Sequence, residues 1–161
     1  MEPLRIVACF SSFLSLLFLM LALASDYWIV NSDQSAHAGL WQTCDHNICM
    51  SYGMQVPGFF HATRAFLLMG KVAGIVSFLG LFASFFHSHI GSISIKCLAV
   101  LASFVAGVCS MIAMSTFTGV YNHHFPGFGI QFGWSFGLGW ATFLLFLITG
   151  GLAYKTVSSA T

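Results

Sequence analysis

Residues 97–117 read CLAVLASFVAGVCSMIAMSTF, an uninterrupted run of 21 residues without a charged side chain. A helix needs about 20 apolar residues to cross a hydrocarbon core of roughly 30 Å. Because the backbone polar groups in that core need partners within the segment itself, this run predicts a membrane-spanning helix. A strand of a membrane barrel would instead alternate apolar and polar residues over about ten positions.

Three further runs have the same character. Residues 6–25 and 132–154 contain no charge, and residues 65–86 contain only Lys71. The chain of 161 residues has the length of a single domain. We therefore expect one membrane domain over residues 1–161, with helices at about 6–25, 65–86, 97–117 and 132–154 and two outer loops at 26–62 and 118–131.

The composition indicates that lipid surrounds most of the chain. Hydrophobic residues make up 58% of the sequence and charged residues 6%, whereas soluble domains carry about 25% charged residues. The partner expected first is thus the lipid bilayer. The formal net charge of +1 gives no basic field to hold nucleic acid.

The first run has an alternative interpretation as a signal peptide. Arg5 precedes the apolar stretch, and Ala22-Leu23-Ala24 resembles a cleavage site. The stretch exceeds the ~7–15 residues that are usual for such a segment, which favours an uncleaved helix. With the N-terminus inside, Arg5, Lys96 and Lys155 all flank the cytosolic side, as the positive-inside rule requires, and both termini are cytosolic.

The first outer loop has the composition of a small antiparallel sheet. Aromatic and β-branched residues predict strands at 26–30, 38–43 and 48–52, with turns at 31–33 and 45–47. Cys44 and Cys49 flank the second turn on the oxidising side, so a disulfide is expected. The alternative is a zinc site completed by His37 and His46, but a second cysteine pair is missing.

The outer residues also carry a resemblance. Trp28, then Gly39-Leu40-Trp41-x-x-Cys44, then Cys49 and Arg64, resemble the signature of the superfamily of claudins, peripheral myelin protein and epithelial membrane proteins. The run FGWSFGLGW at 132–140 is similar to the opening of the fourth helix in its smaller members. The likeness covers essentially the whole chain. It implies an all-α membrane protein, a left-handed four-helix bundle with a small extracellular antiparallel β-sheet.

The resemblance points to two kinds of member, one from the granules of natural killer cells and one from lens fibre cells. The first implies a protein that organises vesicle membranes and supports cytotoxic granule exocytosis in lymphocytes. The alternative is a cell–cell adhesion or junction protein of the lens fibre type. Both imply association with itself or with other membrane proteins through the outer sheet. The short cysteine interval and the ending 158–161 depart from true claudins and put a tight-junction strand in doubt.

Neither catalysis nor transport is favoured. No carboxylate pair is placed for acid–base chemistry, and no catalytic motif occurs, so we expect no enzyme activity, cofactor, metal or small-molecule substrate. A channel or transporter needs a polar lining. The spans offer only scattered Ser and Thr residues and Lys71, which we expect to snorkel to the interface rather than to meet a buried partner.

Three further features carry hypotheses. Gly70-x-x-x-Gly74 and Gly133-x-x-x-Gly137 have the spacing of helix-packing seams. Cys9 and Cys97 lie near the cytosolic face, where the interpretations are reversible palmitoylation or a plain packing role.

At neutral pH three Asp residues and Arg64 give the outer side a charge of −2, and protonation of its five histidines would change this to +3. Imidazole titrates near pH 6.5, so one hypothesis is that His37, His46, His61, His123 and His124 sense acidification of a granule; the alternative is that they are loop histidines without a role.

Overall fold

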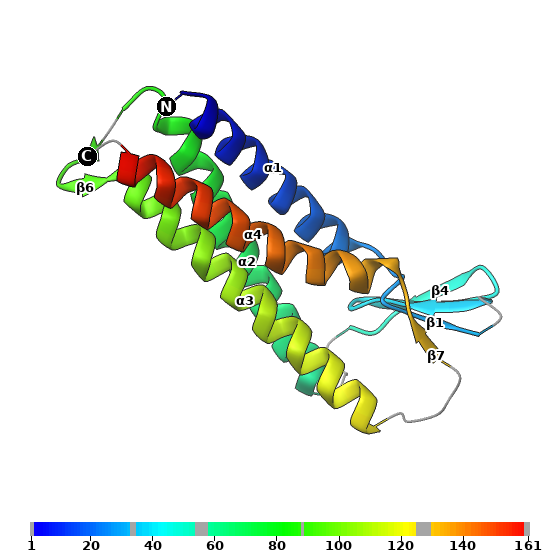
Figure 1. The fold of residues 1–161 in the computed structure, drawn as a ribbon. Coiled ribbons are helices and arrows are strands. Elements are labelled where there is room, and N and C mark those ends of the chain that lie inside the picture. Colours follow the sequence, from blue (N-terminus) through cyan, green and yellow to red (C-terminus); the bar gives the residue numbers. More distant parts are fainter. Residues whose placement is uncertain (1, 33–34, 54–57, 88, 125–129, 160–161) are drawn as a thin grey trace.

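The computed structural model describes residues 2–32, 35–53, 58–87, 89–124 and 130–159. Its four long helices lie side by side, and each is long and apolar enough to cross a membrane. Figure 1 shows both chain ends at one end of this bundle and a sheet at the other; we call these the termini end and the sheet end. The helices are α1 (Glu2–Ala24), α2 (Gly58–Ala83), α3 (Ile95–His124) and α4 (Trp134–Ser159). The expected four-helix membrane fold is confirmed.

The helices are longer than the apolar runs suggested. α2 begins at Gly58 rather than at residue 65, and α3 continues to His124 through part of the expected loop 118–131. Aromatic side chains explain both extensions. Phe59 lies 5.9 Å from the ring of Phe117, and Tyr121 stacks on that ring at 5.7 Å. The extra turns therefore build an aromatic cluster beneath the sheet.

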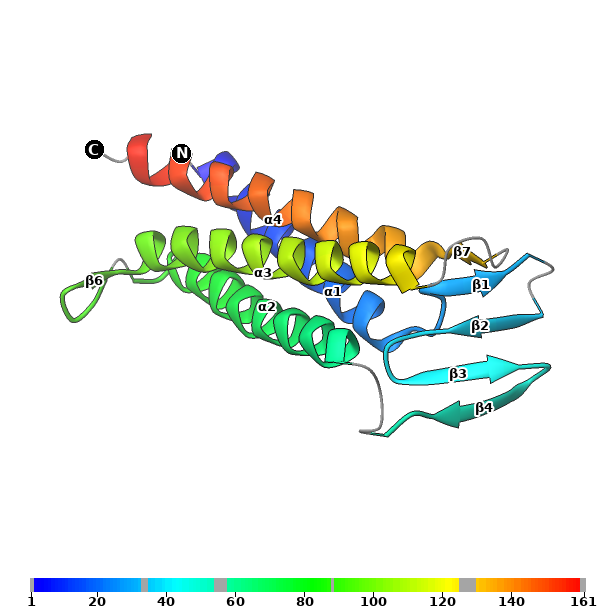
Figure 2. The same cartoon turned by 90° about the horizontal axis from the view of Figure 1, so that it is seen from below.

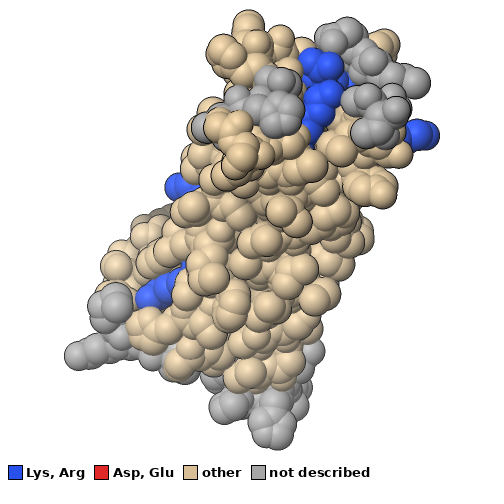
Figure 3. Space-filling view, turned by 90° about the vertical axis from the view of Figure 1, so that its left-hand side faces the viewer, with Lys and Arg blue, Asp and Glu red and all other residues tan. Residues whose placement is uncertain are grey.

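The bundle is apolar inside and outside. Its main contacts join α1 to α4 and α2, and α3 to α2 and α4. Leu19, Leu67 and Phe146 are fully buried between helices, while Phe10 and Leu101 are exposed on the outside. Figure 3 shows a face with a few separate basic patches and no acidic patch. A helix that is apolar all round is suited to a membrane, where lipid covers the outward residues.

The sheet at the other end has five strands rather than three. They are β1 (Ile29–Asn31), β2 (Ala36–Ala38), β3 (Gln42–Asp45), β4 (Ile48–Ser51) and β7 (Ile130–Phe132). Their order is β4-β3-β2-β1-β7, and every pairing is antiparallel (Figure 2). The expected strand 38–43 was wrong because the chain turns at 39–41 between β2 and β3. Strand β7 comes from the second loop. A two-stranded hairpin, β5 (His89–Ile90) and β6 (Ile93–Ser94), lies at the termini end.

The two glycine pairs behave differently. A Cβ on Gly70 would lie 3.5 Å from the Ala106 carbonyl oxygen, and one on Gly74 would lie 2.7 Å from the ring of Phe146. Both glycines therefore form a seam within the chain. The second pair forms no such seam within the chain, and its packing against another chain stays a prediction. Gly133 precedes α4 and packs on the backbone of Tyr27, just before β1. A Cβ on Gly137 would meet nothing within 4 Å.

Hydroxyl groups link the helices inside the bundle. Ser77 of α2 is hydrogen-bonded to Ser103 of α3 and lies 3.4 Å from the Ser12 hydroxyl of α1. Ser11 of α1 is joined to Thr149 of α4 at 2.7 Å. The sequence suggested scattered polar residues, but the fold gathers them into interhelical pairs. Such bonds hold helices together where the hydrophobic effect between them is absent.

Replacement of Phe146 tests the core. Phe146 fills the notch left by Gly74, so Phe146→Ala should lower the free energy of unfolding by roughly 2–3 kcal/mol. This is less than the ~3–5 kcal/mol of a soluble core, because lipid already solvates apolar groups. Thermal unfolding in detergent micelles measures the change. Leu144→Ala is the control, since Leu144 is 56% exposed on the same helix; equal losses for both variants would contradict this assignment of the core.

Candidate functional site

The junction between sheet and bundle begins at the last turn of α1. The indole Nε1 of Trp28 donates to the Ala22 carbonyl at 2.7 Å, and that of Trp41 donates to the Leu23 carbonyl at 2.9 Å. The last four carbonyls of a helix have no partner within the helix. Two side chains of the loop thus cap α1, and this fixes where the loop starts and where it returns.

Trp28 also anchors the first strand in the core. Its side chain is fully buried. The ring meets Phe117 of α3 edge-on at 5.0 Å and Phe136 of α4 at 6.2 Å. Edge-to-face pairs of this kind add about 0.5–1.5 kcal/mol beyond burial of area. The Trp28 side chain therefore joins the segment that leads into β1 to the helices α1, α3 and α4.

Arg64 is the main link between α2 and the loop. The residue is only 4% exposed. Its Nε and Nη2 both donate to the Leu40 carbonyl, at 2.9 and 2.5 Å, and its Nη1 donates to the Gly53 carbonyl at 3.3 Å. The guanidinium also lies over the Trp41 ring, 4.5 Å from its centroid. The carbonyl dipoles and the ring stabilise the positive charge of the guanidinium.

Two glycines allow the backbones to meet at this junction. A Cβ on Gly39 would lie 2.6 Å from the Ser25 carbonyl oxygen and 2.7 Å from the Asp26 Cα. At Gly133 it would collide with the Tyr27 carbonyl, while the Gly133 N–H donates to the Trp28 carbonyl at 2.9 Å. Neither role of Gly133 was visible in the sequence. The apolar run had instead placed residue 133 inside the expected helix at 132–154.

The cysteine pair closes the outermost hairpin. Cys44 and Cys49 face each other across β3 and β4, and a disulfide joins them with their Cα atoms 4.0 Å apart. His46 and Asn47 make the turn with φ values of 50° and 71°, as a tight two-residue hairpin requires. The disulfide prediction is confirmed. The zinc alternative was wrong, because both sulfur atoms are bonded to each other.

Polar groups stiffen the remaining loop. The Gln42 amide donates to the Asp26 carboxylate, and the Gly39 N–H donates to the Gln42 carbonyl at 2.9 Å. Burial raises the pKa of the Tyr52 hydroxyl, while a hydrogen bond with Thr43 and the charge of Arg64 oppose this rise. The buried face of the sheet is thus held at several points along its length.

The edge of the sheet formed by β4, by contrast, is exposed. Strand β4 lies at its edge, and Ile48 and Met50 are 70% and 67% exposed. None of the four residues of β4 carries a charge. Soluble sheets usually protect an edge strand with charges, proline or a bulge. This apolar edge is therefore a surface on which another molecule can pack.

The three outer histidines with described side chains lie in different surroundings. His37 stacks on Tyr27 at 4.0 Å, and its Nδ1 lies 3.0 Å from the Asp26 carbonyl oxygen. His46 pairs with Asp45 at 2.5 Å on the surface, and His61 lies half-buried on α2. The side chains of His123 and His124 fall outside the described residues. Sensing of pH by this set stays a prediction.

Lys71 lies close to this junction. Its half-buried side chain lines a groove of about 260 Å³ together with Trp41 and Leu23, at the sheet end of α1 and α2. This is the direction that snorkelling to the nearer interface requires. Among the described residues no group of three His, Cys, Asp or Glu side chains is placed to hold a metal.

The geometry of Arg64 generates a test. Arg64→Lys keeps the charge, but one ammonium cannot reach both carbonyls and also stack on Trp41, so the free energy of unfolding should fall by about 2 kcal/mol. Thermal unfolding in detergent, followed by tryptophan fluorescence, measures the change. Lys96→Gln removes a cation near the start of α3 and should alter the midpoint little. If Arg64→Lys unfolded at the same midpoint temperature as the wild type, the role of the guanidinium hydrogen bonds would be refuted.

Comparison with known proteins agrees with this architecture. A model of the PMP-22/EMP/MP20/Claudin family matches residues 4–153. Protein NKG7 of Mus musculus is 34% identical over 157 residues, covering 95% of this chain and 91% of that protein, and Protein NKG7 of Homo sapiens is 33% identical over the same shares. The lens fiber membrane intrinsic protein of Homo sapiens is 30% identical over 147 residues, covering 88% and 84%. The chain belongs to the PMP-22/EMP/MP20/Claudin family.

Proposed function

We propose that this protein organises membranes through lateral or facing contacts of its sheet, and that it does so without catalysing a reaction. The observation that carries the proposal is the contrast between the two sides of the sheet. The inner side is clamped to the bundle through Trp28, Trp41 and Arg64. The edge strand β4 presents Ile48 and Met50 to its surroundings. A rigid base with an exposed apolar edge suits recognition of another protein surface.

We propose that both termini lie in the cytosol. Arg5, Lys96 and Lys155 belong to the termini end, and basic residues favour the cytosolic flank of a membrane. The disulfide at the sheet end supports the same threading, since disulfides persist in the lumen of organelles or outside the cell. The sheet would then face a granule lumen or the extracellular space.

We propose the membrane of cytolytic granules, together with the plasma membrane, as the location. Similarity to Protein NKG7 over nearly the whole chain supports a role in granule exocytosis of lymphocytes, as the resemblance of the sequence implies. The lens fiber membrane intrinsic protein is the relative that supports adhesion between cells. Both roles use the same sheet edge and differ in whether the partner lies in the same or in the facing membrane.

Charge on the edge strand tests the proposed surface. The double variant Ile48→Asp, Met50→Asp should reduce self-association at least roughly tenfold, because two carboxylates would have to be desolvated at the contact. Fluorescently labelled protein in liposomes gives the readout: energy transfer within one liposome reports lateral contacts, and clustering of liposomes reports facing contacts.

The control for this experiment is Ser32→Asp, which adds charge at the exposed end of β1 away from β4. It should leave both signals unchanged. Clustering without energy transfer would favour the adhesion role. Unchanged association in the double variant, with normal thermal unfolding, would overturn the proposal that β4 is the contact.

The proposed threading is tested with a tag after Thr161. In intact cells an antibody should reach the tag only after permeabilisation, because the chain end lies on the cytosolic side. A second tag between Asp45 and Asn47 would disturb the hairpin, so the sheet side is better probed through the cysteines. A membrane-impermeant maleimide should label Cys44 and Cys49 from outside only after reduction; labelling of the C-terminal tag on intact cells would contradict the threading.

A further inference from the structure

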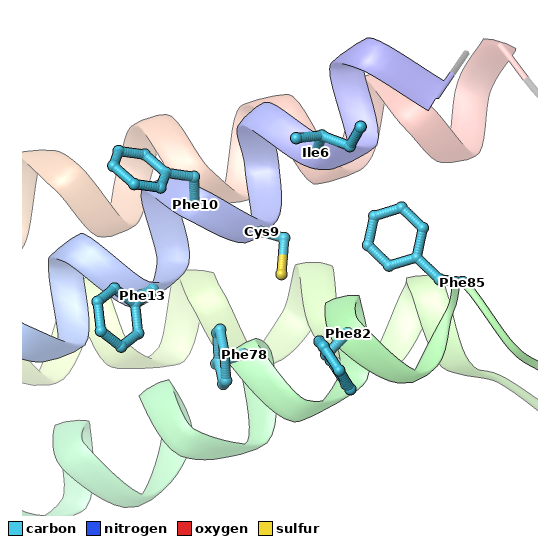
Figure 4. A pocket seen from close by; sticks show the side chains of 7 residues that line it. All are labelled: Ile6, Cys9, Phe10, Phe13, Phe78, Phe82 and Phe85. Atoms are coloured by element: carbon cyan, nitrogen blue, oxygen red, sulfur yellow. The ribbon is translucent and has the colours of Figure 1, made fainter.

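The groove beside Lys71 combines an apolar wall with a positive charge. It lies at the sheet end of α1 and α2 and is lined by Met20, Leu23, Ala24, Trp41, Leu68 and Lys71, of which Lys71 alone is charged. A groove between the same helices at the termini end is different. Figure 4 shows that groove walled by Ile6, Cys9 and phenylalanine rings, with no charged group among the labelled residues. The charge therefore distinguishes the groove at the sheet end from a plain lipid-facing surface.

The groove beside Lys71 lies at the boundary of the hydrocarbon core. Arg5 and Ala24 are 19 positions apart on α1, which corresponds to about 28 Å along a helix axis. This length is close to the roughly 30 Å of the core. With Arg5 at one boundary, Ala24 and the Trp41 ring lie at the other, which is the level that tryptophan prefers. The groove therefore opens next to the layer of lipid phosphates.

The ammonium of Lys71 is available for an external ligand. Arg64, Leu68 and Lys71 follow at i, i+4 and i+7 of α2 and so share one face of that helix. Arg64 uses its donors on the carbonyls of Leu40 and Gly53. Within the part of the chain that the structure describes, Lys71 forms no ion pair, although an ammonium has three donors. An anion at the boundary would stabilise this half-buried charge.

The charges around the groove favour a ligand that is negative overall. Besides Arg64 and Lys71, the described structure places the Asp26 carboxylate at this junction, where it accepts a hydrogen bond from the Gln42 amide. Asp45 lies at the other end of β3. With histidine neutral, two cations and one carboxylate give the junction a net charge of +1, which one phosphodiester neutralises. A zwitterionic lipid would bring a cation of its own and leave this charge in place.

We propose that the groove beside Lys71 binds one acidic phospholipid from the leaflet at the sheet end. The lipid phosphate accepts hydrogen bonds from the Lys71 ammonium, and the first part of an acyl chain lies along Met20, Leu23 and Leu68. A free phosphate ion would gain nothing from this apolar wall. The site is independent of strand β4 and of the threading, because it belongs to whichever leaflet faces the sheet.

Native mass spectrometry of the full chain tests the proposal. The protein is released from detergent micelles that contain equal amounts of phosphatidylglycerol and phosphatidylcholine with the same acyl chains. A complex with one phosphatidylglycerol should form about tenfold more readily than one with phosphatidylcholine, since a charge-assisted hydrogen bond is gained and no second cation is brought in. Lys71→Gln should abolish this preference, and Lys71→Arg should retain it. Glycerol 3-phosphate should not compete, because it lacks acyl chains.

Two further variants control the experiment. Lys96→Gln makes the same change of charge at the start of α3 and should leave the preference unchanged. Ala24→Phe adds bulk at an exposed position of the groove and should lower binding of phosphatidylglycerol, which keeps the test decisive if Lys71→Gln fails to fold. The proposal would be overturned by equal binding of the two lipids, by equal losses for Lys71→Gln and Lys96→Gln, by unchanged binding to Ala24→Phe, or by displacement with glycerol 3-phosphate.

Discussion

The last carbonyls of α1 have to find donors at the boundary of a membrane, and two indole N–H groups provide them. An unpaired carbonyl in such surroundings costs several kcal/mol, so the positions of Trp28 and Trp41 are constrained by the helix rather than by the sheet. Once both indoles are in place, the chain between them must leave the bundle and return to it. Strands β1 and β2 lie on the path between the two indoles, and β3 begins directly after Trp41.

Arg64 completes the attachment from the second helix. A guanidinium that is almost fully buried is stabilised by two carbonyls and a tryptophan ring, and a flexible ammonium could not satisfy all three. The sheet is therefore fixed in orientation relative to the helices. A surface that is held in this way loses little conformational entropy when it binds, which is the physical basis for assigning recognition to its free edge.

The features that the sequence predicted follow from local constraints. Apolar length predicts the four helices, because lipid requires it, and the sorting of cysteines by side predicts the bond between Cys44 and Cys49. The missed features depend on tertiary contacts. Strand β7 was not recognised because three residues at 130–132 adjoin an apolar run and pair only with β1. The contact of Ser12 with Ser77 depends on the rotation of two helices about their axes, which a uniformly apolar sequence does not specify.

The pairing of β7 with β1 has a consequence for biosynthesis. The first four strands leave the ribosome before α2, but their neighbour at residues 130–132 is translated only after α3 has been made. Until then the edge of β1 that faces away from β2 is unpaired. The pairing of β7 with β1 ends this exposure. A chain that stops before residue 130 would expose the unpaired edge of β1 to chaperones and to other nascent proteins.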